Sequence, residues 1–265
     1  LVAARGVRES LGFAATLTAV EVGGLVMVIV AGFLAAPSAD WQAPASVAEA
    51  VPGPLAAATI LAFFAFIGFE DMVNMAEETR EPARTVPRAI LAALALTGLL
   101  YMLVAFAAVR AVPVAVLAAS EQPLALVWQA GTAFGPGVLA AIAVAAALNG
   151  VLAQIVMAAR VLLGIGRRVP AFSALAAIDA RFGTPVRATL LIGVALILGA
   201  LLLPVATLAG ITSGLLLLVF TAVNLALLRL KGRTPRPAFS VPVWVPALGA
   251  ALSVGALGAA MWGVG

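Results

Sequence analysis

Long stretches without a charged residue are the feature that most constrains how this chain can fold. The stretch from Ala188 to Leu228 contains no Asp, Glu, Lys or Arg, and neither do residues 89–109 and 122–159. A helix needs about 20 mostly apolar residues to cross a bilayer. Only 10% of the 265 residues are charged and 64% are hydrophobic, whereas a soluble domain carries roughly 25% charged residues. The sequence therefore predicts an all-α integral membrane protein, not a soluble enzyme, a nucleic-acid-binding protein or a disordered tail.

Charged and helix-breaking residues divide the apolar sequence into about seven predicted transmembrane helices. Pro204 lies in the middle of the longest uncharged stretch, where it favours a turn between two helices. Residues 122–136 contain polar residues and Pro–Gly breaks, so we expect them to lie at the membrane interface. The predicted spans are residues 11–35, 55–77, 88–111, 137–163, 188–203, 206–228 and 242–263, within a single transmembrane domain over residues 1–265.

The distribution of basic residues predicts that the N-terminus lies in the cytoplasm, because cytoplasmic loops of membrane proteins are enriched in Lys and Arg. With this orientation, all of the 15 basic residues except Arg110 fall on the cytoplasmic side, and the outer loops carry Asp40, Glu49 and Glu121. The net charge of +4 therefore reflects topology and not a nucleic-acid partner. We expect a multi-pass protein of the cytoplasmic membrane, with the lipid bilayer around it.

The absence of two residue types limits the chemistry of this chain. It contains no Cys and no His, which excludes disulfides and thiolate metal sites and removes the usual base at neutral pH. The sequence therefore predicts neither an enzyme nor a bound metal or other cofactor.

The second predicted span carries polar residues in its apolar sequence. Gly68 lies about mid-span, and Glu70 and Asp71 follow it closely. Carboxylates inside a membrane are costly and usually face a bundle interior or a watery cavity. One interpretation is a helix interrupted at Gly68, whose freed backbone groups line a cavity and hold a substrate or an ion. The other is that Gly68 is a packing notch and that both acids lie at the cytoplasmic rim. The segment by itself favours neither.

Glu21 is a second candidate functional residue, because it lies about midway along the first predicted span. An isolated carboxylate in a membrane is by default a functional-site hypothesis, here a proton site or a partner for a cation. The alternative is a neutral Glu that is hydrogen-bonded to a neighbouring helix. We favour the functional interpretation.

Several segments resemble the amino acid–polyamine–organocation permeases. The most specific is FFAFIGFEDMVNMAEETREPARTVPRAI at residues 63–90, which resembles the sixth helix of that family and the loop after it. GVRES at residues 6–10, followed by Glu21, resembles the start of the fifth helix. Residues 148–175 and 182–191 resemble the eighth helix, the loop after it and the start of the ninth. The order and spacing of these segments agree over essentially the whole chain.

The resemblance implies the inverted-repeat transporter fold of LeuT type, in incomplete form. The predicted spans then correspond to helices five to eleven, and the first four helices and the last helix of the parent chain are missing. In the family, the substrate sits between the broken first and sixth helices. The implied partners are therefore a small-molecule substrate, an amino acid or amine, and the missing helices of the same parent chain.

The resemblance also assigns roles to individual residues. In the family, carbonyl groups of the sixth helix hold the substrate amine, and an aromatic side chain that matches Phe64 covers the substrate. The residues implied to bind substrate are Phe64, Ala65, Phe66, Ile67 and Gly68, and those implied to gate or couple transport are Glu21, Glu70 and Asp71.

Glu21 departs from the pattern of the family. Several proton-coupled members carry Lys at this position, where it mimics a sodium ion, and Glu cannot do so by the same electrostatics. Residues 133–172 contain no Ser or Thr hydroxyl that could ligate sodium. We therefore expect proton-coupled transport or exchange rather than sodium coupling, with Glu21 itself as a proton site.

The function predicted from these observations is secondary active transport of amino acids or related amines. A seven-helix receptor or light-driven pump fits the helix count, but such proteins have an external N-terminus. The only Lys, Lys231, lies in a loop, where it cannot carry a retinal Schiff base. A membrane scaffold or accessory subunit without transport activity of its own also remains compatible with the sequence.

Overall fold

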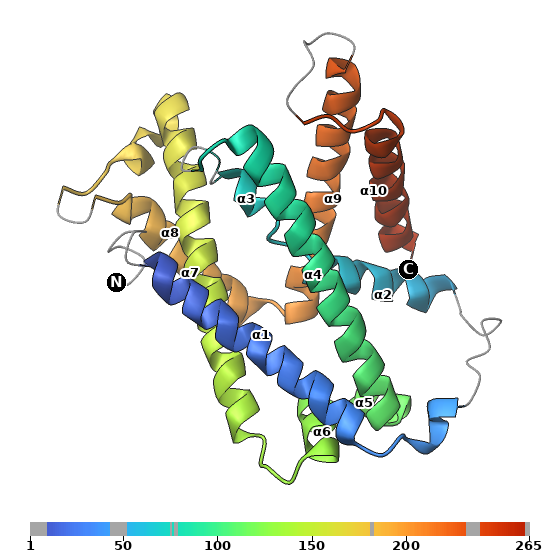
Figure 1. The fold of residues 1–265 in the computed structure, drawn as a ribbon. Helices are drawn as coiled ribbons and strands as arrows, with labels where there is room; N and C mark the ends of the chain where they lie inside the picture. Colours follow the sequence, from blue (N-terminus) through green and yellow to red (C-terminus); the bar gives the residue numbers. More distant parts are fainter. Residues whose placement is uncertain are drawn as a thin grey trace. The chain divides into compact units, whose positions relative to one another are not determined.

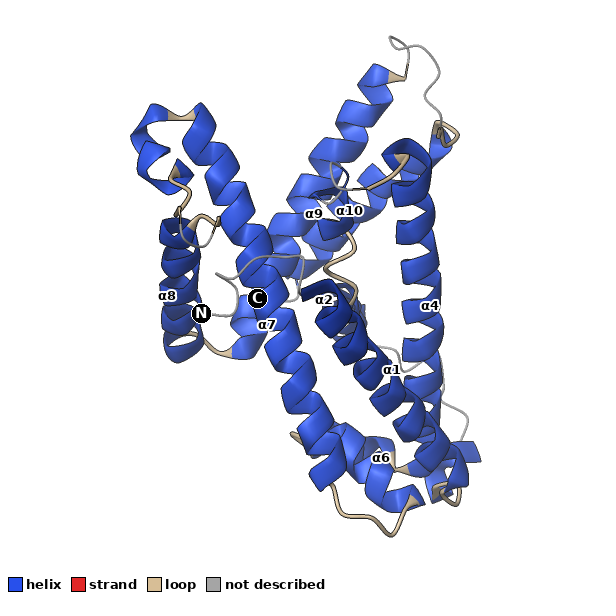
Figure 2. Ribbon diagram, turned by 60° about the vertical axis from the view of Figure 1, so that its left-hand side comes forward, coloured by secondary structure: helices blue, strands red, loops and turns tan. Residues whose placement is uncertain are grey.

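The computed structural model of the chain describes residues 10–42, 52–74, 76, 79–180, 183–231 and 239–262. This part of the chain consists of helices and loops (Figure 2). The longer helices are α1 (Ser10–Leu34), α2 (Pro52–Ala65), α4 (Pro82–Ala111), α7 (Gly137–Arg168), α8 (Val186–Leu202), α9 (Val205–Leu230) and α10 (Trp244–Trp262). The shorter ones are η1 (Ala39–Gln42), α3 (Asp71–Asn74), α5 (Val114–Ala119), α6 (Pro123–Gly131) and η4 (Pro170–Ala176). The predicted all-α class is confirmed for these residues.

Among the described residues, four helices are long and apolar enough to cross a membrane. They are Ala15–Leu34, Pro82–Ala111, Gly137–Arg168 and Thr207–Leu230, and the apolar helices Val186–Leu202 and Trp244–Gly258 are shorter. The side chains of Leu202 and Val205 are 74% and 79% exposed. Exposed apolar surface of this kind marks contact with lipid or with other protein. These observations support a multi-pass membrane protein.

Most helix boundaries lie close to those of the predicted spans. Pro204 is the N-cap of α9 and separates it from α8, as predicted. α4 begins at Pro82, earlier than the predicted start at residue 88. Pro is favoured at the first position of a helix, because the N–H that it lacks would have no partner within the helix there. Pro87, the residue before the predicted start, lies inside α4.

The helices form two compact units. Unit 1 comprises Leu1–Pro44 and Leu96–Leu198, and unit 2 comprises Ala45–Ala95 and Gly199–Gly265.

In unit 1, α1 packs against α6 and α7 (Figure 1). Small residues on α1 and on its neighbours allow the helices to approach closely. A Cβ atom added at Gly131 would overlap the carbonyl oxygen of Ala31. One added at Gly32 would lie 2.8 Å from the Cβ atom of Ala107. Close contact between small residues drives helix association in lipid. α1 is therefore held by several neighbours, which fixes the position of Glu21 along it.

Arg110 joins the C-terminal end of α1 to α4 within unit 1. Its Nη1 atom donates hydrogen bonds to the carbonyl oxygens of Gly32, Phe33 and Ala35, at 2.9, 3.2 and 2.8 Å. The guanidinium group also lies 5.8 Å from the ring centroid of Phe33. The last carbonyl groups of a helix lack partners within the helix, and a cation there interacts favourably with the helix dipole. Arg110 therefore caps α1.

In unit 2, α9 and α10 lie side by side in both views, and α2 packs against both of them (Figure 1, Figure 2). The Nδ2 atom of Asn224 in α9 donates a hydrogen bond to the carbonyl oxygen of Phe220 at 2.8 Å. A Cβ atom added at Gly249 in α10 would lie 2.9 Å from Oδ1 of Asn224. The turn of α9 that carries Phe220 is therefore packed tightly against α10.

Candidate functional site

The helix that contains the predicted substrate residues is interrupted. α2 ends at Ala65, residues 66–70 form turns, and α3 begins at Asp71. Gly68 has a φ angle of 122°, which Gly adopts readily and residues with a Cβ atom do not. The structure thus shows the interrupted helix and not the packing notch. The predicted span 55–77 is not one continuous helix.

Short-range hydrogen bonds shape the turns after α2. The amide of Phe66 donates to the carbonyl oxygen of Phe63 at 3.0 Å, and the amide of Ile67 donates to that of Phe64 at 3.1 Å. These bonds span three residues instead of the four of an α-helix. The backbone therefore leaves the α-helical pattern within the predicted substrate segment.

Glu70 and Asp71, the predicted gating residues, lie at this interruption. The Oε2 atom of Glu70 accepts a hydrogen bond from the backbone N–H of Gly68 at 2.9 Å. Asp71 is the first residue of α3, and its Oδ1 atom accepts a hydrogen bond from Nδ2 of Asn74 at 3.5 Å. Both residues are partly buried. The carboxylate of Glu70 therefore closes the turn around Gly68.

The predicted substrate residues follow one another along the interruption but differ in exposure. The side chain of Phe64 is 38% exposed, and Ala65 is exposed as well. Phe66, Ile67 and Gly68 are partly buried. The segment therefore combines an accessible aromatic ring with backbone groups that have left the regular helix.

Two aromatic residues next to this segment contact a third one that the sequence did not single out. The ring of Phe220 in α9 lies 6.0 Å from that of Phe63, at an interplanar angle of 82°. It also lies 5.6 Å from the ring of Phe69, at 41°. No local pattern in the sequence points to this contact, because Phe220 is far away along the chain and its apolar neighbours resemble any other apolar span.

Glu21 in unit 1 is paired across two helices. The Nδ2 atom of Asn149 in α7 donates a hydrogen bond to Oε1 of Glu21 in α1 at 3.0 Å. Both side chains are partly buried. The bond is of the kind that the alternative interpretation of Glu21 requires, and it also fixes the orientation of the carboxylate.

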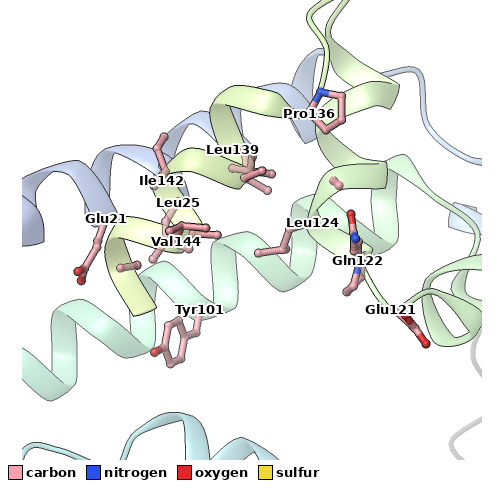
Figure 3. Close-up of a pocket in the computed structure, with 17 residues that line it drawn as sticks. Glu21, Leu25, Tyr101, Glu121, Gln122, Leu124, Pro136, Leu139, Ile142 and Val144 are labelled. Atoms are coloured by element: carbon pink, nitrogen blue, oxygen red, sulfur yellow. The ribbon is translucent and has the colours of Figure 1, made fainter. Parts of the chain in front are cut away.

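A cavity of about 740 Å³ lies beside Glu21 within unit 1. Figure 3 shows the Glu21 carboxylate towards one end, Gln122 and Glu121 towards the other, and apolar side chains such as Leu139 between them. Tyr101 of α4 also lines the cavity. Ligand sites are typically cavities of about 300–1,000 Å³ with mostly apolar walls and a few polar groups. Tyr101 could not be identified from the sequence, since a lone Tyr in an apolar span forms no pattern.

The structure contains two candidate sites, the interruption and the cavity. The interruption belongs to unit 2 and the cavity to unit 1. Among the residues that the structure describes, no group of three or more acidic side chains is placed to hold a metal ion.

The comparison with known proteins assigns the family. Residues 1–265 match the model of the amino acid permeases. An uncharacterized transporter of Mycobacterium tuberculosis is 33% identical over 98% of this chain and 60% of its own length. The vacuolar cationic amino acid transporter 4 of Arabidopsis thaliana is 29% identical over 85% of this chain and 38% of its own length. The branched-chain amino acid permease BcaP of Bacillus subtilis is 29% identical over 69% of this chain and 40% of its own length.

This chain thus spans less than two thirds of each of these relatives. Their names describe transporters and permeases and not enzymes, in agreement with the prediction that this chain is not an enzyme. The family match covers every residue and confirms the resemblance seen in the sequence. The chain belongs to the amino acid permease family.

Proposed function

We propose that this chain takes part in secondary active transport of amino acids or related amines across the cytoplasmic membrane. The observation that carries the proposal is the interruption at Gly68, at the end of an apolar helix in a member of the amino acid permease family. Transporters place such interruptions near the bilayer midplane, where freed backbone groups hold the substrate. The protein adopts a LeuT-type inverted-repeat fold, in which these residues supply helices five to eleven and the parent chain supplies the others.

The proposed substrate site is the segment of residues 64–68. A carbonyl oxygen has two lone pairs, so the carbonyl of Phe64 can accept a hydrogen bond from a substrate ammonium in addition to the one from Ile67. The accessible ring of Phe64 covers the substrate. The relatives named above are a cationic amino acid transporter and a branched-chain amino acid permease, so lysine and leucine are the first substrates to test.

Glu21 is the proposed coupling residue. The hydrogen bond from Asn149 holds its carboxylate at the wall of the cavity in unit 1. From there it can take up a proton in one half of the transport cycle and release it in the other. The proposed mode is proton-coupled uptake or exchange, because each step needs only a carboxylate with access to solution.

Glu70 and Asp71 are the proposed gating residues. The carboxylate of Glu70 holds the turn closed through the amide of Gly68. Release of this hydrogen bond frees the turn to change shape, while Asp71 keeps the start of α3 in place through Asn74. Such a local change around a fixed site suits alternating access.

The test is uptake of tritiated lysine and tritiated leucine by proteoliposomes that contain the full-length parent protein, with and without an imposed proton gradient. Gly68→Leu should reduce uptake about tenfold or more, because a side chain at this φ angle adds about 1–3 kcal/mol of strain. Gly210→Leu in α9 is the matched control, since a Cβ atom there meets nothing within 4 Å and no unusual φ is involved. It should transport at close to the wild-type rate.

Two results would contradict the proposal. One is a wild-type protein that is correctly inserted but takes up neither amino acid. The other is wild-type uptake by Gly68→Leu, which would remove the substrate site from the interruption.

A further inference from the structure

We infer that Phe220 of α9 is a positioning residue for the substrate segment, and that its single ring holds both flanks of the interruption in α2. The inference deepens the proposed function and rests on it for the role of residues 64–68. Phe220 acts through Phe63 and Phe69 and not on the substrate.

The two ring contacts lie on opposite sides of the interruption. Phe63 is in the last turn of α2, and Phe69 is in the turn after Gly68. The ring of Phe220 lies 6.0 Å from the first and 5.6 Å from the second, centroid to centroid. Both separations fall in the range of about 4.5–7 Å that aromatic pairs prefer. One side chain of a neighbouring helix thus contacts the chain before and after the substrate segment.

The hydrogen bonds that shape the turn connect residues close together in the chain. Phe66, Ile67 and Gly68 donate to groups two or three residues away along the chain. Such bonds define the shape of the turn, but they do not fix the direction in which the chain continues after it. The direction depends on contacts with another element, and Phe220 supplies two of them at once.

α9 is a suitable support because the turn around Phe220 is itself held. Asn224, one turn further along α9, donates a hydrogen bond to the carbonyl oxygen of Phe220 and packs against Gly249 of α10. Leu217, on the preceding turn, is buried. The ring therefore projects from backbone that is fixed within unit 2, and it transmits that fixed position to the carbonyl groups of the substrate segment.

The experiment measures the order of the turn directly. The 265 residues contain no Cys, so Ile67→Cys introduces one thiol in the substrate segment of a parent protein from which any other Cys has been removed. The rate at which a small methanethiosulfonate reagent labels this thiol is compared with and without Phe220→Leu. Loss of both aromatic contacts should raise the labelling rate about fivefold. In Phe220→Leu with Ile67 retained, KM for tritiated lysine or leucine should rise by a similar factor, while kcat changes less.

Three further variants make the result specific. Phe220→Tyr keeps the ring and should label and transport like the wild type. Leu218→Ala changes a side chain on the same helix that is 56% exposed, and it should have no effect on either measurement. Phe69→Leu removes one of the two contacts from the other side and should shift labelling and KM in the same direction by a smaller factor. It also tests the inference if Phe220→Leu does not fold.

The inference is overturned if Phe220→Leu and Phe69→Leu both label at the wild-type rate, or if Phe220→Tyr behaves like Phe220→Leu. Labelling needs no substrate, so this arm gives its answer even if the wild type transports neither amino acid. A wild type that transports neither amino acid would count against the proposed function and not against the role of Phe220.

Discussion

The side chains of Glu21 and Asn149 illustrate how one contact can serve two roles. Their hydrogen bond of 3.0 Å joins α1 to α7, and it would do so whether or not the carboxylate carries protons. Replacing the carboxylate of Glu21 by an amide distinguishes the structural role from the role as a proton carrier. Gln keeps the size of Glu and its capacity to accept a hydrogen bond, but it cannot take up and release a proton in the same way.

We therefore expect Glu21→Gln to remove the stimulation of uptake by an inward proton gradient, while exchange of amino acid at equal pH persists. The measurement is uptake by proteoliposomes with and without an imposed gradient. Asn149→Ala is the companion variant, because it removes the hydrogen bond and leaves the carboxylate, and it should retain a response to the gradient. A Glu21→Gln protein that responds to the gradient like the wild type would assign Glu21 a structural role only.

Arg110 permits a prediction about stability. Arg110→Ala leaves three carbonyl groups at the end of α1 without their partner. Hydrogen bonds to charged groups contribute roughly 1.5–3 kcal/mol, so we expect the free energy of unfolding to fall by about 2 kcal/mol. Unfolding in detergent measures this change, with Arg187→Ala, at an exposed position of α8, as the control. An equal decrease in the free energy of unfolding of both variants would show that the hydrogen bonds from Arg110 to α1 do not contribute to stability.

At the scale of elements, the contact between α1 and α6 depends on the absence of a side chain at Gly131. An added Cβ atom would overlap the carbonyl oxygen of Ala31, which is backbone and cannot rotate away. We expect Gly131→Ala to separate the two helices and to lower stability by about 3 kcal/mol, the upper end of the usual cost of overpacking.

Gly150→Ala in α7 is the matched control for this prediction. No atom lies within 4 Å of a Cβ atom added there, and Ala is the better helix former by about 1 kcal/mol. Its melting temperature should equal or exceed that of the wild type, whereas that of Gly131→Ala should fall. If the two variants melt at the same temperature, the close approach of α1 and α6 is not a source of stability.

The interruption of α2 was one of two interpretations that the sequence left open, and the residues that raised it lie next to one another in the chain. A Gly followed closely by two carboxylates is rare inside an apolar span, and the structure places Gly68 at a φ angle that needs Gly. The start of α4 was predicted too late. The predicted start was residue 88, whereas the helix begins at Pro82 and contains Pro87.

For the whole molecule, the sequence predicted most of the helix boundaries but not what the helices contact. Charges mark the ends of spans, so the boundaries followed from their positions. Contacts such as those of Phe220 with Phe63 and of Glu21 with Asn149 could not be predicted. In lipid, the outer and inner faces of a helix are both apolar, so periodicity does not reveal which residues meet.

The predicted topology is a property of the whole molecule and can be tested by itself. Ala83 and Gln122 are exposed in the structure. The excess of basic residues places the first on the cytoplasmic side and the second outside. We expect a membrane-impermeant thiol reagent to label Gln122→Cys in right-side-out vesicles and Ala83→Cys only in inverted ones. The opposite pattern would reverse the orientation and revive the seven-helix receptor as an alternative.

The measurement that tests the central claim most directly is substrate protection of the thiol in Ile67→Cys. The claim is that residues 64–68 bind the amino acid that is transported. Excess lysine or leucine, whichever the protein transports, should slow labelling of this thiol severalfold, with half-maximal protection near the KM for uptake. The same amino acid should not slow labelling of Val73→Cys, at a position in α3 that is 58% exposed. Labelling of Ile67→Cys at an unchanged rate, under conditions that saturate uptake, would contradict the claim.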